Sequence, residues 1–509
     1  MAQIRRASQT FEEKQSSEGE LIEAAPLPTP LPKTQLAILL LVQMPEQLTA
    51  SVIYPFVNQL VRSTGITGGD ERKTGYYAGL IESLYYAVEA ITILQWGRVS
   101  DRIGRKPVIL VGLFGVTLSI VSFGFSNQFW MIILSRCAQG ALNGNIGVVK
   151  STMTEITDAS NVAQAFAWLP LAWGTGYTLG FLIGGVLSDP ADKWPNSVGH
   201  YPLFHRYPYF LPCIVAASVS TFSWLITLVF FKESMRSTAS KNRSVSHSDN
   251  TKKSPMRAAT IHYQPGDTQI DTLPHVLDEA EIASPVSCSL ESTRTDFRAI
   301  LIPGVMIPVL HYGLLSFVDQ CMLVLVPLMY STSRSLGGLG FSSNTIGLVM
   351  SVWSMLNGMT QVYMFPRLLR KFGPKRLYII SFAFFLITFS TFPLMGYMAK
   401  RKMEAGMWLI LCLQLVAYIA AYITYSCIIL YVNNGAPNKD LLGATNGLAQ
   451  MLGSLMRAVG PTVVSSLFAL SLEKDLLGGT AVYWIMCTIV MVILGCSTYL
   501  PKTLTWTSL

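Results

Sequence analysis

A few charged side chains lie inside the long apolar stretches of this 509-residue chain. A charge in the middle of a membrane is costly, and it usually faces a cavity, a partner charge or an ion path. The candidates are Glu46, Glu82, Glu89, Arg136, Asp319 and Arg457. A buried carboxylate can bind a cation or take up and release a proton, so these positions are the first candidates for chemistry.

Glu46 and Asp319 occupy corresponding places in the two halves, each upstream of a proline in its apolar stretch. Glu46 also follows Pro45, which would bend its helix and free a backbone carbonyl. We predict that both carboxylates act as coupling acids for a moving proton. Two alternatives stay open, because Glu46 could form a structural ion pair with Arg136 and Asp319 could pair with Arg457.

Two regular spacings place side chains on one face of a helix. Glu82 and Glu89 are seven residues apart and would share a face, and we predict a structural role for both. Tyr418, Tyr422 and Tyr425 follow an i, i+4, i+7 pattern. Such a stripe more often packs helices than contacts a ligand. As a cavity wall, it would favour aromatic or cationic organic solutes.

These side chains need membrane-spanning helices to position them. The composition is 51% hydrophobic and 13% charged, and the mean hydropathy is +0.42. Apolar stretches of about 20 residues, the length that a bilayer requires, occur near 36–60, 76–97, 108–126, 129–149, 162–188, 207–231, 299–330, 343–369, 376–398, 405–432, 442–470 and 479–500. The sequence therefore predicts an all-α integral membrane protein with twelve transmembrane helices.

Polar segments divide the chain into five parts. We predict a cytosolic tail at 1–34, a six-helix bundle at 35–231, a disordered cytosolic linker at 232–298, a second six-helix bundle at 299–500 and a cytosolic tail at 501–509. The linker is rich in polar residues and shows no helical periodicity. Lys and Arg concentrate in the loops that this orientation places in the cytosol. Arg72-Lys73 and Lys400-Arg401-Lys402 run against that trend.

Composition and missing motifs disfavour several function classes. The formal net charge of +8 comes from basic residues in short loops, which suits membrane orientation better than nucleic-acid binding. Seven of the eight cysteines lie in apolar stretches, without zinc-ligand spacing or a disulfide framework. No nucleophile elbow or phosphate-binding loop is present in the sequence. We therefore predict neither an enzyme nor an ATP-driven pump, and no metal or other cofactor.

A dense group of charges separates the second and third apolar stretches. Its marked positions are Gly97, Asp101, Arg102, Gly104, Arg105 and Lys106. This Gly-x-x-x-Asp-Arg-x-Gly-Arg-Lys pattern resembles the signature of the major facilitator superfamily, in its cytosolic loop between spans 2 and 3. The resemblance implies two six-helix bundles and a cytosolic gate latched through Asp101, Arg102 and Arg105. A partial second copy at 366–376 keeps Gly373 and the basic residues but lacks the acid.

The fourth apolar stretch carries further residues of this kind. The sequence around Arg136 resembles the Arg-x-x-x-Gly motif of span 4 in this superfamily, which implies an arginine in the central cavity that influences proton movement. Asn143 and Asn145 follow on the same stretch and could hydrogen-bond across helices. We expect Glu155 or Asp158 to pair with the signature's basic residues and to latch the gate.

Glycine-rich stretches occur at corresponding places in both halves. The first contains Gly176, Gly180, Gly184 and Gly185. It resembles the superfamily's antiporter motif, except that Phe181 stands at the motif's proline position. The glycines allow flat helix packing, whereas the missing proline weakens the inference of antiport. In the second half, Gly460 and Pro461 keep part of the bending device, and Asn446 precedes them.

Together the motifs resemble the twelve-span, drug:proton antiporter-like branch that includes the fungal and plant zinc-induced-facilitator-like transporters. The predicted cavity residues are Glu46, Arg136, Asn143, Asn145, Asp319, Tyr422, Asn446 and Arg457. The resemblance implies a proton-coupled transporter of a small solute, working by alternating access in efflux or vacuolar sequestration. It implies a plasma or vacuolar membrane. A monomer is the default expectation for the protein's oligomeric state. A uniporter of the same fold and a non-transporting sensor that signals through the linker stay open as alternatives.

Overall fold

The computed structural model describes residues 30–157, 161–166, 168–234, 301–437 and 439–501. These residues form helices and short connections, and no β-strand occurs among them. Most of both predicted tails lies outside the described residues, and so do Asp158 and all but three residues of the predicted linker. The described helices of both halves belong to one compact unit.

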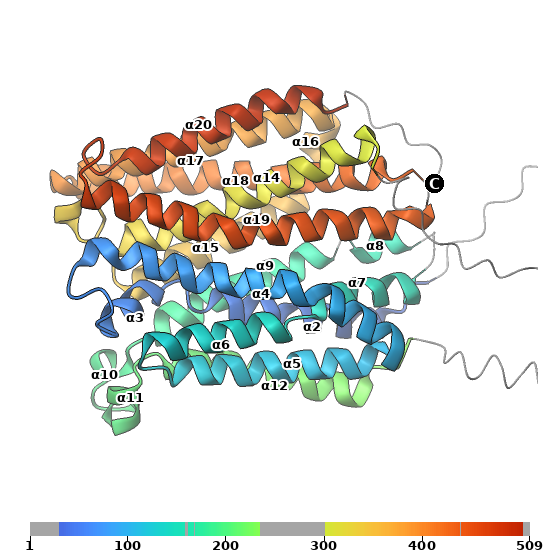
Figure 1. The fold of residues 1–509 in the computed structure, drawn as a ribbon, viewed down its shortest axis with the longest axis horizontal. Coiled ribbons are helices and arrows are strands. Elements are labelled where there is room, and N and C mark those ends of the chain that lie inside the picture. The colour runs from blue at the N-terminus through green and yellow to red at the C-terminus, as the bar shows by residue number, and fades with distance from the viewer. Residues whose placement is uncertain (1–29, 158–160, 167, 235–300, 438, 502–509) are drawn as a thin grey trace, which may run out of the picture. The chain divides into compact units, whose positions relative to one another are not determined.

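The first half of the chain is drawn from blue to green in Figure 1. Its helices are α2 (Lys33–Ser51), α3 (Val57–Ser63), α4 (Thr74–Ile103), α5 (Arg105–Gly124), α6 (Phe129–Leu142), α7 (Asn145–Ile156), α8 (Val162–Phe166), α9 (Leu169–Leu187), α10 (Pro190–Lys193), α11 (Pro202–Arg206) and α12 (Phe210–Phe230). Short 3-10 turns η1 (Glu71–Lys73) and η2 (Val198–His200) lie between them.

The second half is drawn from yellow to red in Figure 1. Its helices are α14 (Pro303–Ser331), α15 (Ser343–Tyr363), α16 (Phe365–Phe372), α17 (Pro374–Lys400), α18 (Glu404–Gly435), α19 (Lys439–Glu473) and α20 (Ala481–Cys496). Two 3-10 turns, η4 (Arg334–Leu336) and η5 (Ser497–Tyr499), complete it.

Every predicted apolar stretch is largely helical, but three stretches contain no single helix that is long and apolar enough to cross a membrane. Among the described residues, eight helices are long and apolar enough to cross a membrane, and α4, bent by 43° between Ile93 and Gln95, makes nine. The other three stretches are the pairs α2–α3, α6–α7 and α15–α16, interrupted before Pro55, at Asn143 and before Pro366. The predicted twelve-helix, all-α fold is confirmed. Non-helical backbone at membrane depth usually lines a cavity or is buried in protein.

The two halves meet along two helix pairs, α4 with α19 and α9 with α15. Figure 1 shows α4 and α19 running side by side. Glycines allow both contacts, because a Cβ on Gly79 would overlap the side chain of Ser465. A Cβ on Gly185 would lie 2.6 Å from the Cα of Gly347. These close approaches fix the frame in which polar side chains from both halves can meet.

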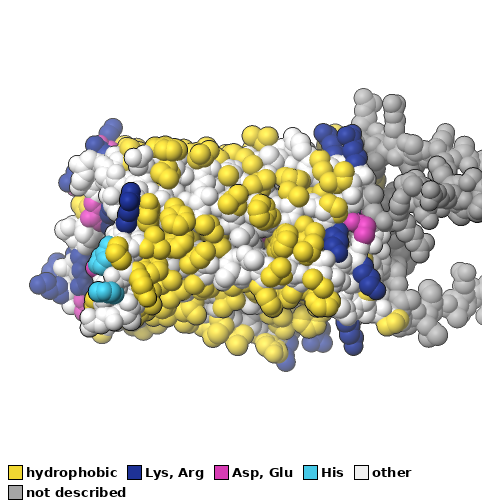
Figure 2. Space-filling view, turned by 90° about the horizontal axis from the view of Figure 1, so that it is seen from below, with side chains coloured by type: hydrophobic (Ala, Val, Ile, Leu, Met, Phe, Trp, Pro, Cys, Tyr) yellow, Lys and Arg dark blue, Asp and Glu magenta, His cyan; other side chains and the backbone are white. Residues whose placement is uncertain are grey.

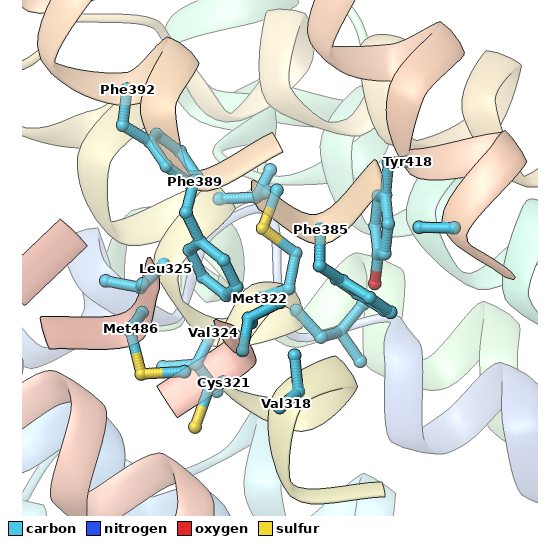
Figure 3. Packing of buried hydrophobic residues seen from close by; sticks show 14 of the residues in the cluster. Val318, Cys321, Met322, Val324, Leu325, Phe385, Phe389, Phe392, Tyr418 and Met486 are labelled. Carbon is cyan, nitrogen blue, oxygen red and sulfur yellow. The ribbon is translucent and has the colours of Figure 1, made fainter. Parts of the chain in front are cut away.

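The largest apolar cluster belongs mainly to the second half and surrounds α14. Figure 3 shows Phe385, Phe389 and Phe392 of α17 with Met322 and Leu325 of α14 in this cluster. Within its apolar window α14 is 72% buried, against 33% for α12. α14 is therefore an interior helix, whereas α12 turns much of its surface outward.

The outer surface separates apolar from charged side chains. Figure 2 shows hydrophobic side chains over the middle of one face, with Lys and Arg gathered toward both ends. Exposed apolar side chains such as Trp130, Phe222, Val229 and Leu409 contribute to the outer surface. An apolar belt bounded by charges suits a protein whose middle lies in hydrocarbon. We call the end of the bundle that carries Gly97–Pro107 the signature end and the other the opposite end.

Candidate functional site

A buried ion pair joins α6 to α4 inside the first half. The Arg136 Nη2 atom lies 2.9 Å from Glu82 Oε1, and both side chains are almost fully enclosed. Arg136 also donates to Gln139 Oε1 at 2.7 Å, and its guanidinium lies 4.4 Å from the centre of the Tyr85 ring. The Tyr54 hydroxyl donates to the second Glu82 oxygen at 3.1 Å. The ion-pair partner of Arg136 is therefore Glu82, whereas one alternative from the sequence had paired it with Glu46.

Two further carboxylates of the first half meet at one amide. Asn143 Nδ2 lies 3.2 Å from Glu46 Oε1, 3.4 Å from Glu89 Oε1 and 2.8 Å from the Tyr85 hydroxyl. Glu46 and Glu89 are both buried, and neither forms an ion pair with any described residue. Glu46 Oε2 is buried without a hydrogen-bond partner in the structure. This arrangement leaves room for a proton or a cation to balance the two carboxylates.

The break between α6 and α7 positions this amide. α6 ends at Leu142, and Asn143 takes a non-helical conformation before α7 begins. The Trp96 indole donates to the Ala141 carbonyl at 2.7 Å, and a Cβ on Gly144 would overlap its ring. The absence of a side chain at Gly144 therefore lets Trp96 of α4 pack against the break between α6 and α7.

Asn145 does not join the carboxylates. Its buried side chain lies against Gly112 of α5, where a Cβ on the glycine would overlap the Asn145 amide. The sequence predicted both asparagines at the cavity. The structure places Asn143 beside Glu46 and Glu89, and it uses Asn145 in the contact between α7 and α5.

Asp319 of α14 lies beside an aromatic wall. Its Oδ1 atom accepts a hydrogen bond of 2.8 Å from the Tyr418 hydroxyl. The Tyr418 ring stacks on Trp353 at 4.4 Å between centres, and Tyr422 meets Trp353 edge-on at 5.8 Å. Tyr425 continues the wall at 5.1 Å from Tyr422. The predicted tyrosine stripe thus packs against α15 and at the same time surrounds a carboxylate.

Arg457 of α19 forms no ion pair with Asp319. Its Nε atom donates to its own helix at the Gly453 carbonyl, 3.3 Å away. Its charge nevertheless acts on Glu46, Glu89 and Asp319. One cation of the second half therefore interacts electrostatically with carboxylates of both halves, without a direct contact to any of them.

Two of the side-chain hydrogen bonds that link the halves lie on α14 and near the signature end. Gln320 Nε2 donates to the Tyr54 hydroxyl at 3.0 Å, so Tyr54 connects α14 to the Glu82–Arg136 pair. Nearer the signature end, Lys150 of α7 donates to Gln450 of α19 at 3.3 Å. A displacement of one half relative to the other would break both bonds.

The signature loop gathers charges from three helices. Arg105 Nη1 lies 2.7 Å from Asp101, and Arg105 Nη2 lies 2.7 Å from Glu155 of α7. The predicted pairing of Glu155 with a basic residue of the signature is present in the structure. Arg102 is exposed and makes no ion pair within the described ranges. A Cβ on Gly97 would meet no atom within 4 Å.

Sequence reasoning missed Glu233, which lies just after α12. Its two carboxylate oxygens accept the backbone N–H groups of Arg105 and Lys106 at 2.9 and 3.0 Å, which caps the start of α5. Acidic groups stabilise helix N-termini in this way. Gly104 precedes this cap with φ 104°, in a region that favours glycine. The available signal was an acid directly after an apolar stretch.

The glycines of α9 form helix contacts as predicted. Gly176 and Gly180 pack against α2, Gly184 packs against Val52 and Pro55 in the break between α2 and α3, and Gly185 packs against α15. Phe181 is fully buried, and its ring lies 6.1 Å from Tyr54 and 5.8 Å from Tyr177.

The corresponding residues of α19 have different surroundings. Gly460 packs against α14, and the Pro461 carbonyl faces Gly79 of α4. Asn446 is exposed and donates to Asn433 of α18 at 2.9 Å, so it contacts a neighbouring helix.

A second set of polar contacts joins the halves at the opposite end. Arg62 Nη2 lies 3.0 Å from Glu71 Oε1, and Arg62 Nη1 donates to the Ser331 carbonyl at 3.2 Å. The Ser333 N–H donates to Glu71 at 2.9 Å. Sequence analysis did not single out either charged residue, because a loop sequence does not reveal which half its charges contact.

Comparisons with known proteins identify this architecture. A family model described as the Major Facilitator Superfamily matches residues 39–461. The chain belongs to this superfamily. As a member of the superfamily it is a transporter of small solutes and not an enzyme, which confirms both predictions.

Three relatives show the same membership over most of their length. The major facilitator-type transporter psiT2 of Psilocybe cyanescens is 31% identical over 485 residues, which is 92% of this chain and 90% of that protein. The multidrug transporter mfsB of Aspergillus fumigatus is 26% identical, with 91% and 82% covered. The ZINC INDUCED FACILITATOR 1 protein of Arabidopsis thaliana is 27% identical, with 92% of each chain covered. The resemblance to this branch is therefore confirmed.

A solved structure shows the superfamily fold independently. The crystal structure of a D-xylose-proton symporter aligns with a TM-score of 0.64 at 14% identity and covers 92% of this chain and 97% of that one. At this identity the similarity concerns the fold alone. Within the described ranges, no cluster of three or more His, Cys, Asp or Glu residues could hold a metal ion.

Proposed function

We propose that this superfamily member couples the export or vacuolar sequestration of a small solute to the movement of protons. The observation that carries the proposal is the group Glu46, Glu89 and Asp319, three carboxylates that lack an ion-pair partner among the described residues. All three interact electrostatically with Arg457. Uptake of a proton by one of them would change the net charge of this group of side chains.

Alternating access would move the halves about the central carboxylates. At the opposite end, Arg62 and Glu71 hold the first half to α14, and the Gly185–Gly347 approach packs α9 on α15. Opening that end requires these contacts to separate. The hydrogen bond between Tyr54 and Gln320 would break in the same step. Because Tyr54 also donates to Glu82, a change at the Glu82–Arg136 pair would alter this hydrogen bond between the halves.

The remaining organisation is part of the same proposal. The moving bodies are the six-helix bundles at 35–231 and 299–500, and the protein works as a monomer. Its termini and signature end face the cytosol of a plasma or vacuolar membrane, as the distribution of Lys and Arg favours. The Aspergillus relative is named a multidrug transporter and the Arabidopsis relative a zinc-induced facilitator, and neither name fixes the solute of this chain.

Proteoliposomes with an internal pH dye test the proposal. A proton gradient is imposed, and cationic drugs, organic anions, amino acids and metal ions are added in turn. We expect one class to trigger proton movement, and we expect Glu46→Gln and Asp319→Asn each to abolish it. Glu404→Gln is the matched control, because Glu404 pairs with Arg334 at the surface and lies outside the cavity. Unchanged proton movement in both variants would show that neither Glu46 nor Asp319 is a coupling acid.

A uniporter is the second candidate, and Phe181 favours it. This residue stands where the antiporter motif has proline, and its ring is packed against Tyr54 and Tyr177. A proline there would bend α9, and the phenylalanine leaves it continuous. Solute flux without any proton movement in the same liposomes would favour the uniporter.

A further inference from the structure

Two cations from different halves lie near Tyr312 of α14. The Lys150 ammonium donates to Gln450 Oε1 at 3.3 Å, and the Tyr312 hydroxyl donates to the same oxygen at 3.3 Å. A Cβ on Gly453 would lie 2.6 Å from the Tyr312 ring and 3.2 Å from Arg457 Nη2. Neither Lys150 nor Arg457 forms an ion pair with a described residue, and each uses one donor in a hydrogen bond to such a residue. Since an ammonium has three donors and a guanidinium five, both keep donors for an anionic group.

Buried polar atoms without partners lie close to these cations. The Lys150 ammonium lies 5.4 Å from the centre of the Trp173 ring, and the Trp173 indole donates to Gln43 Oε1 at 3.0 Å. Glu46 follows Gln43 on α2, about 4.5 Å farther along the helix axis. Gln43 Nε2, Glu46 Oε2 and Asn143 Oδ1 have no hydrogen-bond partner among the described residues, and the three side chains are at most 5% exposed. Such atoms are rare in proteins, because leaving them unpaired is costly. A bound solute would supply their partners.

Lys150 lies nearer the signature end than the carboxylates. The start of α2 packs against the start of α5, which leaves the signature loop, so Gln43 lies nearer that end than Glu46. Lys150 and Gln450 are half-buried, whereas Glu46 and Glu89 are enclosed. The hydrogen bond between Lys150 and Gln450 also joins the two halves. A solute from the signature end would therefore meet Lys150 first, and separation of this bond would open the way to the carboxylates.

The cations and the carboxylates interact without touching. Both Lys150 and Arg457 interact electrostatically with Glu46, and Arg457 also interacts with Glu89. No ion pair joins these four side chains within the described ranges. Buried opposite charges are stabilised most by direct contact and additional hydrogen bonds. Charges of both signs that stay apart are therefore the arrangement expected where a solute with both charges fits between them.

We propose that the solute is a small zwitterion, in which an amine and an anionic group are joined, and this inference rests on the transport function proposed above. The anionic group binds Lys150 and Arg457. The amine binds Glu46 and Glu89, with Asn143 Oδ1 as a third acceptor. A solute with only a negative charge would leave these acceptors unpaired, and one with only a positive charge would leave both cations without a partner. A zwitterion pairs both groups and adds no net charge to an enclosed site.

Thermal stabilisation of the purified full chain measures binding without a proton gradient. The carboxylate series consists of each amino acid, its methyl ester and its N-acetyl derivative, and the phosphate series consists of phosphoethanolamine, ethylamine and ethyl phosphate. We expect at least one zwitterion to stabilise the protein, and its singly charged relatives to bind about tenfold more weakly, since each loses hydrogen bonds to charged groups. Stabilisation by no zwitterion, or equal binding of a singly charged relative, would overturn the proposal.

Variants assign the two charges of the solute. Lys150→Met should weaken binding of the zwitterion about tenfold and leave binding of its methyl ester unchanged, whereas Lys150→Arg should keep zwitterion binding. Glu46→Gln should weaken binding of the zwitterion and leave binding of the N-acetyl derivative unchanged. Lys474→Met is the matched control, because Lys474 is exposed directly after α19. Equal losses for the zwitterion and the methyl ester in Lys150→Met would overturn the assignment.

Binding and coupling can fail separately. Zwitterion binding without proton movement in the liposomes would uphold the class of solute and contradict the proposed coupling. Proton movement that only singly charged solutes trigger would uphold coupling and overturn the class of solute.

Discussion

The reversal between α4 and α5 and the reversal between α16 and α17 use the same backbone device. Gly104 has φ 104° and ψ 161°, and Gly373 has φ 72° and ψ 164°. Each glycine ends one helix and begins the next. The side chains around them differ. Arg105 pairs with Asp101 and Glu155, whereas the second copy has no acid at the corresponding position.

The basic residues of the second copy bind carbonyl oxygens instead. Arg370 donates to Pro366 of its own helix at 3.3 Å, and Lys375 donates to the Thr498 and Leu500 carbonyls at 2.7 and 2.5 Å. The first copy thus ties together α4, α5, α7 and the end of α12. The second copy is hydrogen-bonded through Lys375 to the segment that follows α20. The comparison teaches that both copies keep the glycine turn, whereas only the first copy has the ion pairs of Arg105 with Asp101 and Glu155.

The same contrast recurs inside the membrane. The first half holds its arginine in the buried Glu82–Arg136 pair, while Asp319 in the second half is held by the Tyr418 hydroxyl. Removing one partner of a buried ion pair strongly destabilises a protein, because the other charge stays buried without compensation. A hydrogen bond between transmembrane helices contributes about 1 kcal/mol. The two halves should therefore respond very differently to matched substitutions.

The largest expected difference is between Arg136→Ala and Tyr418→Phe. Removing Arg136 leaves Glu82 buried without its cation, and we expect a loss of about 3–5 kcal/mol in the free energy of unfolding. Removing the Tyr418 hydroxyl should cost about 1 kcal/mol. Equilibrium unfolding in mixed micelles measures both. The double variant Arg136→Gln, Glu82→Gln should recover part of the loss, and equal losses in the two single variants would refute the contrast.

Arg105→Ala and Arg376→Ala test the loops themselves. Arg105→Ala leaves Asp101, Glu155 and Glu233 close together without the cation, and we expect a cost of about 1.5–3 kcal/mol. Most of it should come from Glu155, because the Asp101 side chain is 62% exposed and its pair is screened by water. Arg376 is exposed, so its removal should cost little. Thermal unfolding followed by tryptophan fluorescence, together with the rate of solute transport, compares them. Similar effects at both positions would mean that the latch is repeated after all.

The smallest difference is expected between Gly104→Ala and Gly373→Ala. Both glycines have backbone angles that other residues adopt at a cost of about 1–3 kcal/mol. At Gly104 the added Cβ would also lie 2.7 Å from Glu233 Oε2 and disturb the cap on α5, which adds about 1 kcal/mol. At Gly373 a Cβ meets no atom within 4 Å. Denaturant unfolding of the two variants should show this increment. Its absence would show that the cap adjusts freely.

Apolar length and motif spacing were sufficient to predict the helices and the signature loop. They were also sufficient to select Glu46, Arg136 and Asp319 as candidate functional residues, because charges inside apolar stretches are rare. They were not sufficient to pair Arg136 with Glu82, since pairing depends on helix rotation and tilt. They also assigned Glu89 only a structural role, although it shares Asn143 with Glu46. Contacts between distant segments, such as Glu233 with α5, have no local signal in the sequence.

The burial of α14 has a consequence for how the protein is made. α14 leaves the ribosome before α17, α18 and α20, yet its polar groups depend on them, because His311 lies 3.1 Å from the Tyr378 hydroxyl and Asp319 accepts from Tyr418. Until those helices are synthesised, a carboxylate and an imidazole of α14 have no partner from them in the translocon or the surrounding lipid. Assembly of the second half is therefore the stage most exposed to quality control. Substitutions that delay α17 or α18 should lower the yield of the whole protein before they alter transport.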